Sequence, residues 1–174
     1  MFENATNGDL DKLIKKCKGN LSEEVVRILF AQLINYNEYM QKQGVMHRDL
    51  KPLNIMLDKH YNVKVIDFGD ARKVNEELDD EEGGTGMMRR GTFVGTVNYQ
   101  SPEVINEEEQ GLPIDTWALG NILFKMLTGH VPFKGSVPHT VYKDIKNRNI
   151  QWPAPDAIDK IMSKEAQDLI NRMI

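Results

Sequence analysis

The pattern of hydrophobic and polar positions predicts a mainly helical chain with a small β-hairpin. Across residues 22–44, apolar or aromatic side chains recur with the spacing of one helix face, at Val26, Leu29, Phe30, Leu33, Tyr36 and Met40. Ser22 can cap this helix at its start, and Gly44 can end it. The segment is therefore predicted to be an amphipathic helix with one buried face.

Three further segments carry clear patterns. The short β-prone runs at 55–57 and 63–66 are separated by the polar turn "DKHYN", which predicts a hairpin. The segment "IDTWALGNILFKMLTG" at 114–129 is almost entirely apolar from Trp117 onward, as expected of a helix that is buried on most sides. Shorter helices are predicted at 138–147 and from Ser163 toward Met173.

Between the hairpin and the buried helix the pattern changes to charge. Residues 76–86 read "EELDDEEGGTG", with six acids in the first seven positions and three glycines in the last four. Like charges repel one another, and glycine loses the most conformational freedom on folding, so a mobile loop is predicted.

Composition narrows the classes of partner. The 174 residues suit one compact domain, and 22 basic against 26 acidic residues give a net charge of -4. This balance argues against a nucleic-acid partner, and the lack of a signal or long apolar segment argues against membrane contact from this segment. The single cysteine, Cys17, allows no internal disulfide and favours a cytoplasmic location, with the nucleus also possible.

Two short motifs predict phosphate chemistry, "HRDLKPLN" at 47–54 and "DFG" at 67–69. Transfer of a phosphoryl group from ATP to a hydroxyl needs a group that orients the nucleophile, positive charge near the phosphate, and ligands for Mg²⁺. Asp49 can accept the hydroxyl proton, and Lys51 can face the γ-phosphate. Asn54 and Asp67 offer the oxygen ligands that Mg²⁺ prefers, and the hairpin between the motifs can bring them together.

The ordered set of motifs resembles the eukaryotic protein kinase family. "SPE" at 101–103 and "DTWALG" at 115–120 follow the first two motifs in the family's order. "NGDL" at 7–10, "GTFVGTVNYQSPEVI" at 91–105 and "SKEAQDLINRMI" at 163–174 are similar to the AGC group, and within it to the 3-phosphoinositide-dependent kinases. The resemblance implies a kinase-like C-terminal lobe over 1–174, with a hinge tail at its start and an activation segment at 67–103.

Within that resemblance, further residues acquire roles. Lys51 implies a protein substrate with a Ser or Thr acceptor, and the hydroxyl of Thr96 is expected to bridge Asp49 and Lys51. Asp9 is expected near the ribose of ATP, with a helix-start charge as the alternative. Met56 and Ile66 are expected at the adenine pocket, with core packing as the alternative. Leu10, Ile122 and Met126 are expected beneath them.

The resemblance also implies a switch and a substrate preference. Thr92 corresponds to the phosphorylated residue of the activation loop, and phospho-Thr92 is expected to pair with Arg48 and Arg72. At positions where Arg-directed kinases carry acids, this chain has Leu53 and Lys125, so no strong preference for Arg ahead of the acceptor is expected.

Several kinase parts have no counterpart in the 174 residues. No glycine-rich loop precedes the catalytic motif, so the N-terminal lobe is predicted to be absent here and present in the full protein. The chain also stops before the family's last helices. Glu103 is expected to lack its Arg partner, because Arg172 comes too early in the chain. The chain alone is therefore predicted to be an inactive fragment; the alternatives are a catalytically silent scaffold and a truncated regulator.

Overall fold

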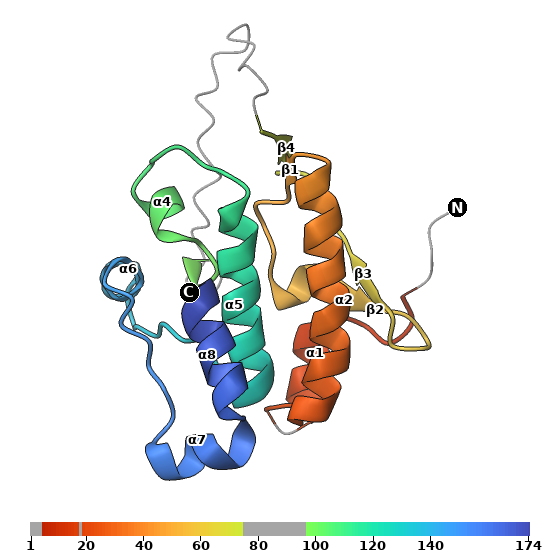
Figure 1. The fold of residues 1–174 in the computed structure, drawn as a ribbon, viewed down its shortest axis with the longest axis vertical. Helices are drawn as coiled ribbons and strands as arrows, with labels where there is room; N and C mark the ends of the chain where they lie inside the picture. The colour runs from red at the N-terminus through yellow and green to blue at the C-terminus, as the bar shows by residue number, and fades with distance from the viewer. Residues whose placement is uncertain (1–4, 18, 75–96) are drawn as a thin grey trace, which may run out of the picture.

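The computed structural model describes residues 5–17, 19–74 and 97–174, and helices make up most of its regular structure (Figure 1). Its elements in chain order are α1 (Leu10–Lys16), α2 (Glu23–Lys42), β1 (Val45–Met46), η1 (Pro52–Asn54), β2 (Ile55–Leu57), β3 (Val63–Val65), β4 (Arg72–Lys73), α4 (Pro102–Ile105), α5 (Pro113–Thr128), α6 (Pro138–Lys146), α7 (Pro155–Ile161) and α8 (Lys164–Met173). The prediction of a mainly helical fold with a small hairpin is confirmed.

Helix α5 is the centre of the core, as its apolar sequence predicted. Figure 1 shows α5 between α2 on one side and α8 on the other, and α5 packs against both. Its side chains are buried on all faces, among them Leu119, Ile122 and Phe124, which have no exposed surface. Gly120 allows the close approach of α8, because a Cβ there would lie 2.8 Å from the Cβ of Met173.

Helix α2 follows its predicted pattern, with one difference at its start. Its predicted buried face is confirmed except at Tyr36, which is half-buried, and Gly44 beyond its end has the left-handed φ of 66° that favours glycine. Ser22 occupies the position before the first turn, but its hydroxyl makes no capping hydrogen bond. Glu23 instead accepts hydrogen bonds from the backbone N–H of Ser163 at 2.6 Å and from its hydroxyl at 2.7 Å, which ties α2 to the start of α8.

The predicted hairpin is β2–β3, an antiparallel pair with Ile55 opposite Val65 and Leu57 opposite Val63. The prediction of a single sheet is wrong, because β1 and β4 form a second antiparallel pair, with Val45 opposite Lys73 and Met46 opposite Arg72. Strands of two residues carry too little alternation to be found from sequence. Strand β1 directly precedes the first phosphate motif and β4 follows the second, so this pair joins the two ends of the segment that carries both motifs.

The remaining helices lie at the edges of the core. Helices α6 and α8 match their predicted ranges, whereas α1, α4 and α7 were not predicted because each spans only four to seven residues. Helices α4 and α7 both begin with proline, which suits a first helical turn.

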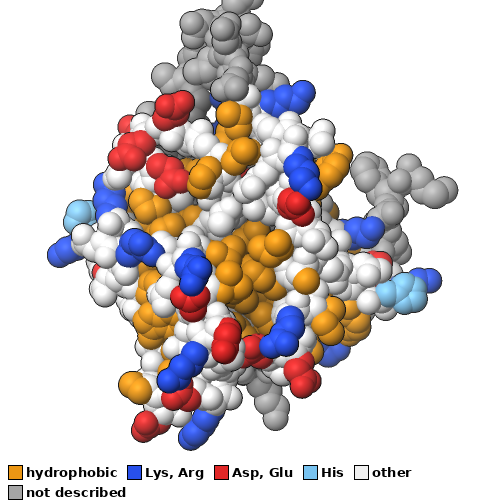
Figure 2. All heavy atoms as spheres, in the orientation of Figure 1, with side chains coloured by type: hydrophobic (Ala, Val, Ile, Leu, Met, Phe, Trp, Pro, Cys, Tyr) orange, Lys and Arg blue, Asp and Glu red, His pale blue; other side chains and the backbone are white. Residues whose placement is uncertain are grey.

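One face of the molecule carries both apolar and charged side chains. Figure 2 shows hydrophobic side chains gathered in the middle of the face over α2 and α5, with basic and acidic side chains around them. In the part of the chain that the structure describes, no helix is both long and apolar enough for a membrane span.

Candidate active site

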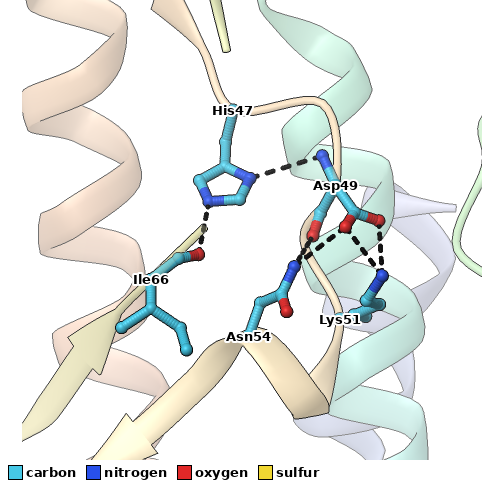
Figure 3. Close-up of polar contacts among 5 residues, drawn as sticks. All are labelled: His47, Asp49, Lys51, Asn54 and Ile66. Atoms are coloured by element: carbon cyan, nitrogen blue, oxygen red, sulfur yellow. Dashed lines mark hydrogen bonds and ion pairs between the residues drawn. The ribbon is translucent and has the colours of Figure 1, made fainter. Parts of the chain in front are cut away.

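The side chains of the catalytic motif converge on the Asp49 carboxylate (Figure 3). Lys51 Nζ donates to both carboxylate oxygens, at 3.0 Å and 2.7 Å. Asn54 Nδ2 donates to Asp49 Oδ2 and to the Asp49 backbone oxygen, both at 2.9 Å. Lys51 and Asp49 retain 20 % and 18 % of their side-chain exposure, so the carboxylate is partly enclosed but still accessible to a substrate.

The hairpin brings the second motif to Asn54, as predicted. The backbone N–H of Ile66 donates to the Asn54 carbonyl at 2.9 Å, so Asp67 follows directly on the residue paired with Asn54. Asp67 is exposed and has a φ of 66°, which is uncommon for a residue with a side chain. The amide oxygen of Asn54 lies on the side of its amide away from Asp49.

His47 joins the two motifs through its imidazole ring. The ring Nδ1 accepts from the Asp49 backbone N–H at 3.3 Å, so Nε2 carries the proton and donates to the Ile66 carbonyl at 3.1 Å (Figure 3). The ring of Phe68 lies against the same imidazole, with centroids 4.9 Å apart. His47 is fully buried, so this link is protected from water.

Asp115, in the first turn of α5, holds the backbone of the catalytic motif through two hydrogen bonds. Its Oδ2 accepts from the His47 N–H at 2.7 Å, and its Oδ1 accepts from the Arg48 N–H at 3.0 Å. Burial raises the pKa of the Asp115 carboxyl above its ordinary value, although the two N–H groups lower it. Arg48 has a φ of 71°, and the two hydrogen bonds to Asp115 hold the backbone that leads into this conformation.

Two basic residues of the predicted switch lie near each other. The Nε of Arg48 is buried without a hydrogen-bond partner in the described chain. Burial lowers the pKa of the Arg48 guanidinium, and the charge of Arg72 lowers it further. Thr92 and Thr96, and the acidic run at 76–82, lie outside the described residues, so the predictions for them are not tested here.

Of the residues predicted near the nucleotide, Met56 lies on the hairpin, and Asp9 and Ile66 lie beside it. Asp9 and Met56 form an isolated antiparallel backbone bridge, and Met56 is half-buried. The Asp9 carboxylate caps α1, accepting from the Lys12 N–H at 2.8 Å and pairing with the Lys12 ammonium at 3.1 Å. Of the two readings of Asp9, the helix-start charge is the one visible in the fold. Ile66 is 41 % exposed, whereas Leu10, Ile122 and Met126 are core residues.

The predicted substrate-facing residues differ in their surroundings. Leu53 is 56 % exposed on η1, as expected for a surface contact. The ammonium of Lys125 is ion-paired with Asp11, and only 18 % of the Lys125 side chain is exposed. Arg172 pairs with Asp168 on its own helix at 2.8 Å, in line with the prediction that it is not the partner of Glu103.

The oxygen atoms of Asn54 and Asp67 suit a hard cation that takes its remaining ligands from outside the protein. Among the described residues, no three His, Cys, Asp or Glu side chains are grouped for metal binding. Asn54 and Asp67 supply one neutral and one anionic oxygen. This matches Mg²⁺, which takes few protein ligands and completes its shell with water and phosphate oxygens.

The whole chain, residues 1–174, matches the family model described as "Protein kinase domain". The chain belongs to the protein kinase family. It is 36 % identical over 166 residues to "Serine/threonine-protein kinase PKH2" of Candida albicans, which covers 94 % of this chain and 17 % of the relative. It is 34 % identical over 170 residues to "Serine/threonine-protein kinase PDK1" of Cryptococcus neoformans, covering 98 % of this chain and 13 % of the relative.

A third relative is "3-phosphoinositide-dependent protein kinase B" of Dictyostelium discoideum, 36 % identical over 160 residues, which covers 92 % of this chain and 17 % of that protein. The predicted similarity to the phosphoinositide-dependent kinases of the AGC group is confirmed, at modest identity. The kinase chain spans less than a fifth of the length of these three relatives.

Three residues that shape this site, His47, Asp115 and Asp11, had no predicted role of their own. His47 and Asp115 belong to two of the quoted motifs, whereas Asp11 belongs to none of them. A signal did exist for Asp115, because an acid in the first turn of an almost fully apolar helix needs a buried partner. His47 and Asp11 gave no such signal, because their partners at Ile66 and Lys125 are distant in the sequence.

Proposed function

We propose that this kinase chain is the substrate- and metal-binding part of an ATP-dependent serine/threonine kinase related to the phosphoinositide-dependent kinases. The observation that carries the proposal is the convergence of Lys51 and Asn54 on the Asp49 carboxylate, with Asp67 next to the backbone partner of Asn54. These are the groups that phosphoryl transfer to a hydroxyl requires.

Asp49 is the group that orients the acceptor hydroxyl and accepts its proton. Its carboxylate is partly exposed and is held in place by two donors, so it is positioned before substrate arrives. Lys51 has three N–H donors, and two of them are directed at Asp49. The third is available for an oxygen of the transferring phosphoryl group. In this proposal Thr96 adds a hydroxyl between these two side chains.

Magnesium, when bound, neutralises charge on the ATP phosphates, and Asn54 and Asp67 are the residues that would hold it. The amide nitrogen of Asn54 is engaged by Asp49, which leaves the amide oxygen as the ligand. Orientation of Asp67 comes from the backbone pairing of Ile66 with Asn54 and from the His47 contact to the Ile66 carbonyl. Both ligands are therefore fixed by the hairpin.

We propose that the nucleotide covers the edge formed by Asp9, Met56 and Ile66. Ile66 is an exposed apolar side chain beside the proposed metal ligands, and an adenine ring would remove it from water. A ribose contact by Asp9 requires its Oδ2 to leave the ammonium of Lys12, whose side chain is 75 % exposed.

The resemblance assigns the remaining catalytic parts to a separate N-terminal lobe. We propose that residues 1–174 form a partial kinase domain with the activation segment at 67–103, that the full protein supplies the other lobe, and that the chain alone is inactive. The protein substrate presents a Ser or Thr hydroxyl, and no nucleic acid takes part. A cytoplasmic or nuclear location stays a prediction.

The proposed switch is phosphorylation of Thr92. Burial lowers the pKa of Arg48 and the charge of Arg72 lowers it further, although Asp70 and Asp115 raise it. The buried Nε of Arg48 has no hydrogen-bond partner among the described residues. These features favour an added anion near both guanidinium groups. A phosphate on Thr92 would supply charge and acceptors to Arg48 and Arg72 together.

The test of the reaction uses the full-length protein, Mg-ATP, and matched Ser/Thr and Tyr peptide libraries. Asp49→Asn should lower kcat by about 10²–10⁴-fold, the usual contribution of a positioned acid or base. Asp168→Asn, a surface change on α8, is the matched control and should leave the rate unchanged. Equal rates for the wild type and Asp49→Asn would refute the assignment. Stabilisation by Mg-ATP without transfer would indicate a silent scaffold, and neither effect would indicate a regulator.

A further inference from the structure

A buried carboxylate near the catalytic loop is neutralised by two lysines of very different exposure. Asp11 is 7 % exposed, in the first turn of α1. One oxygen is ion-paired with Lys125 of α5, whose side chain is 18 % exposed. The other is paired with Lys15 at 2.7 Å, and the Lys15 side chain is 76 % exposed. The two lysines therefore hold Asp11 from the protein side and from the solvent side.

The helix that carries this carboxylate packs beside the catalytic loop. Helix α1 packs against η1, which continues directly from Lys51 and carries the exposed Leu53. Burial raises the pKa of Tyr99, in the segment that leads into α4, and the charge of Asp11 raises it further. The site is thus bounded by α1, α5 and the chain on the C-terminal side of Thr96.

The pairing with Lys125 decides what Asp11 can bind. Removing one partner of an enclosed ion pair leaves the other charge without compensation, which is a strong driving force for a replacement cation. The pair with Lys15 is the weaker of the two, because the Lys15 side chain is 76 % exposed and water and salt compete for its ammonium. Without Lys125, Asp11 would therefore be an acceptor for an ammonium or guanidinium group.

We infer that Lys125 fills, from within the protein, a cation subsite whose acceptor is Asp11, and so prevents selection of basic substrate side chains there. The inference rests on the proposed kinase function and refines its substrate class. It replaces the simpler expectation of charge repulsion by Lys125. The ligand class that the opened subsite takes is an Arg or Lys side chain of a peptide.

The subsite itself is tested without catalysis. The terminal part of the missing lysine side chain is added back as n-butylammonium chloride to Lys125→Ala in the full-length protein, and thermal unfolding is followed. The amine should raise the unfolding temperature of Lys125→Ala above that seen with equal sodium chloride. It should have no such effect on the wild type, on Lys15→Ala, or on Asp11→Asn combined with Lys125→Ala. An equal effect on all four proteins would overturn the inference.

Substrate selection is tested with peptides in which one Arg is moved along the residues that precede the acceptor. Lys125→Met, which keeps most of the side-chain volume, should raise kcat/KM for one Arg position by about tenfold relative to Leu there, the scale of one charge-assisted hydrogen bond. Adding Asp11→Asn should remove the gain. A gain that persists without Asp11, or no gain, would overturn the inference. If the wild type phosphorylates no peptide, the proposed function fails, while the amine experiment still decides on the subsite.

Discussion

Replacing Asp115 by alanine should destabilise the protein and disable the catalytic loop together. The carboxylate is 2 % exposed and accepts the backbone N–H groups of His47 and Arg48 at 2.7 Å and 3.0 Å. Hydrogen bonds to a charged group contribute about 1.5–3 kcal/mol each, and a buried N–H left without an acceptor costs about 1–3 kcal/mol. Alanine also removes the cost of burying the carboxylate, which offsets part of the loss. We expect a net loss of about 3–5 kcal/mol.

Asparagine at 115 separates the two contributions. It keeps one acceptor oxygen and places an N–H₂ group against the other backbone N–H, so about half of the alanine effect is expected, roughly 2 kcal/mol. The stability of the wild type should also depend on pH in a way that the stability of the two variants does not. Because the folded pKa of Asp115 is raised above its ordinary value of 3.8, the advantage of the wild type is greatest below 3.8 and declines as pH rises through the folded pKa.

The measurement is urea unfolding of the full-length protein alongside kcat for the best peptide. Asp168→Asn is the control, because its side chain is 59 % exposed and its pair with Arg172 should contribute less than about 1 kcal/mol. Activity should fall further than stability alone explains, since Arg48 can then leave its left-handed conformation and carry Asp49 with it. An Asp115→Ala protein within 1 kcal/mol of the wild type, by the scale of ordinary surface changes, would refute the reasoning.

Three further expectations follow from other parts of the fold. Gly120→Ala should cost about 1–3 kcal/mol in urea unfolding, because its Cβ would lie 2.8 Å from an atom of α8, whereas Gly111→Ala, with its nearest contact at 3.4 Å, should be close to neutral. Glu23→Gln should reduce stability at neutral pH but not at low pH. The Ser163 N–H and hydroxyl lower the pKa of Glu23 below 4.5, so its contribution is lost as pH falls through the folded pKa; equal pH profiles would contradict this. Thr92→Ala should lower kcat severalfold or more if the proposed switch operates, and unchanged activity in a phosphorylated preparation would exclude it.

The sequence was sufficient for elements whose pattern extends over many residues. Helix α2 repeats its apolar spacing over 20 residues, and α5 is apolar over most of 16, so both were predicted within a few residues of their ends. The two-residue strands β1 and β4 pair across a long stretch of chain, and no local signal marks them. Helices α1, α4 and α7 are too short to show a repeat.

For the candidate site, the sequence predicted which side chains take part but not how they are supported. Asp49, Lys51 and Asn54 are neighbours in the chain, and their chemistry can be read from one loop. Asp115 comes 67 and 68 residues after the residues it holds, and Asp11 lies 114 residues from Lys125. Such contacts depend on the fold and leave no pattern in a single sequence.

Both phosphate motifs contain one residue in a left-handed conformation that a side chain disfavours, Arg48 at 71° and Asp67 at 66°. Conformations of this kind cost about 1–3 kcal/mol each and persist only where the surroundings hold them. The Asp115 carboxylate holds the first through two N–H groups, and the His47 imidazole connects the first to the residue before the second. The geometry of the reactive groups is therefore set by a buried carboxylate and a buried ring. A substitution in the core helix α5 can for this reason reach Asp49 and Asp67 without touching either side chain.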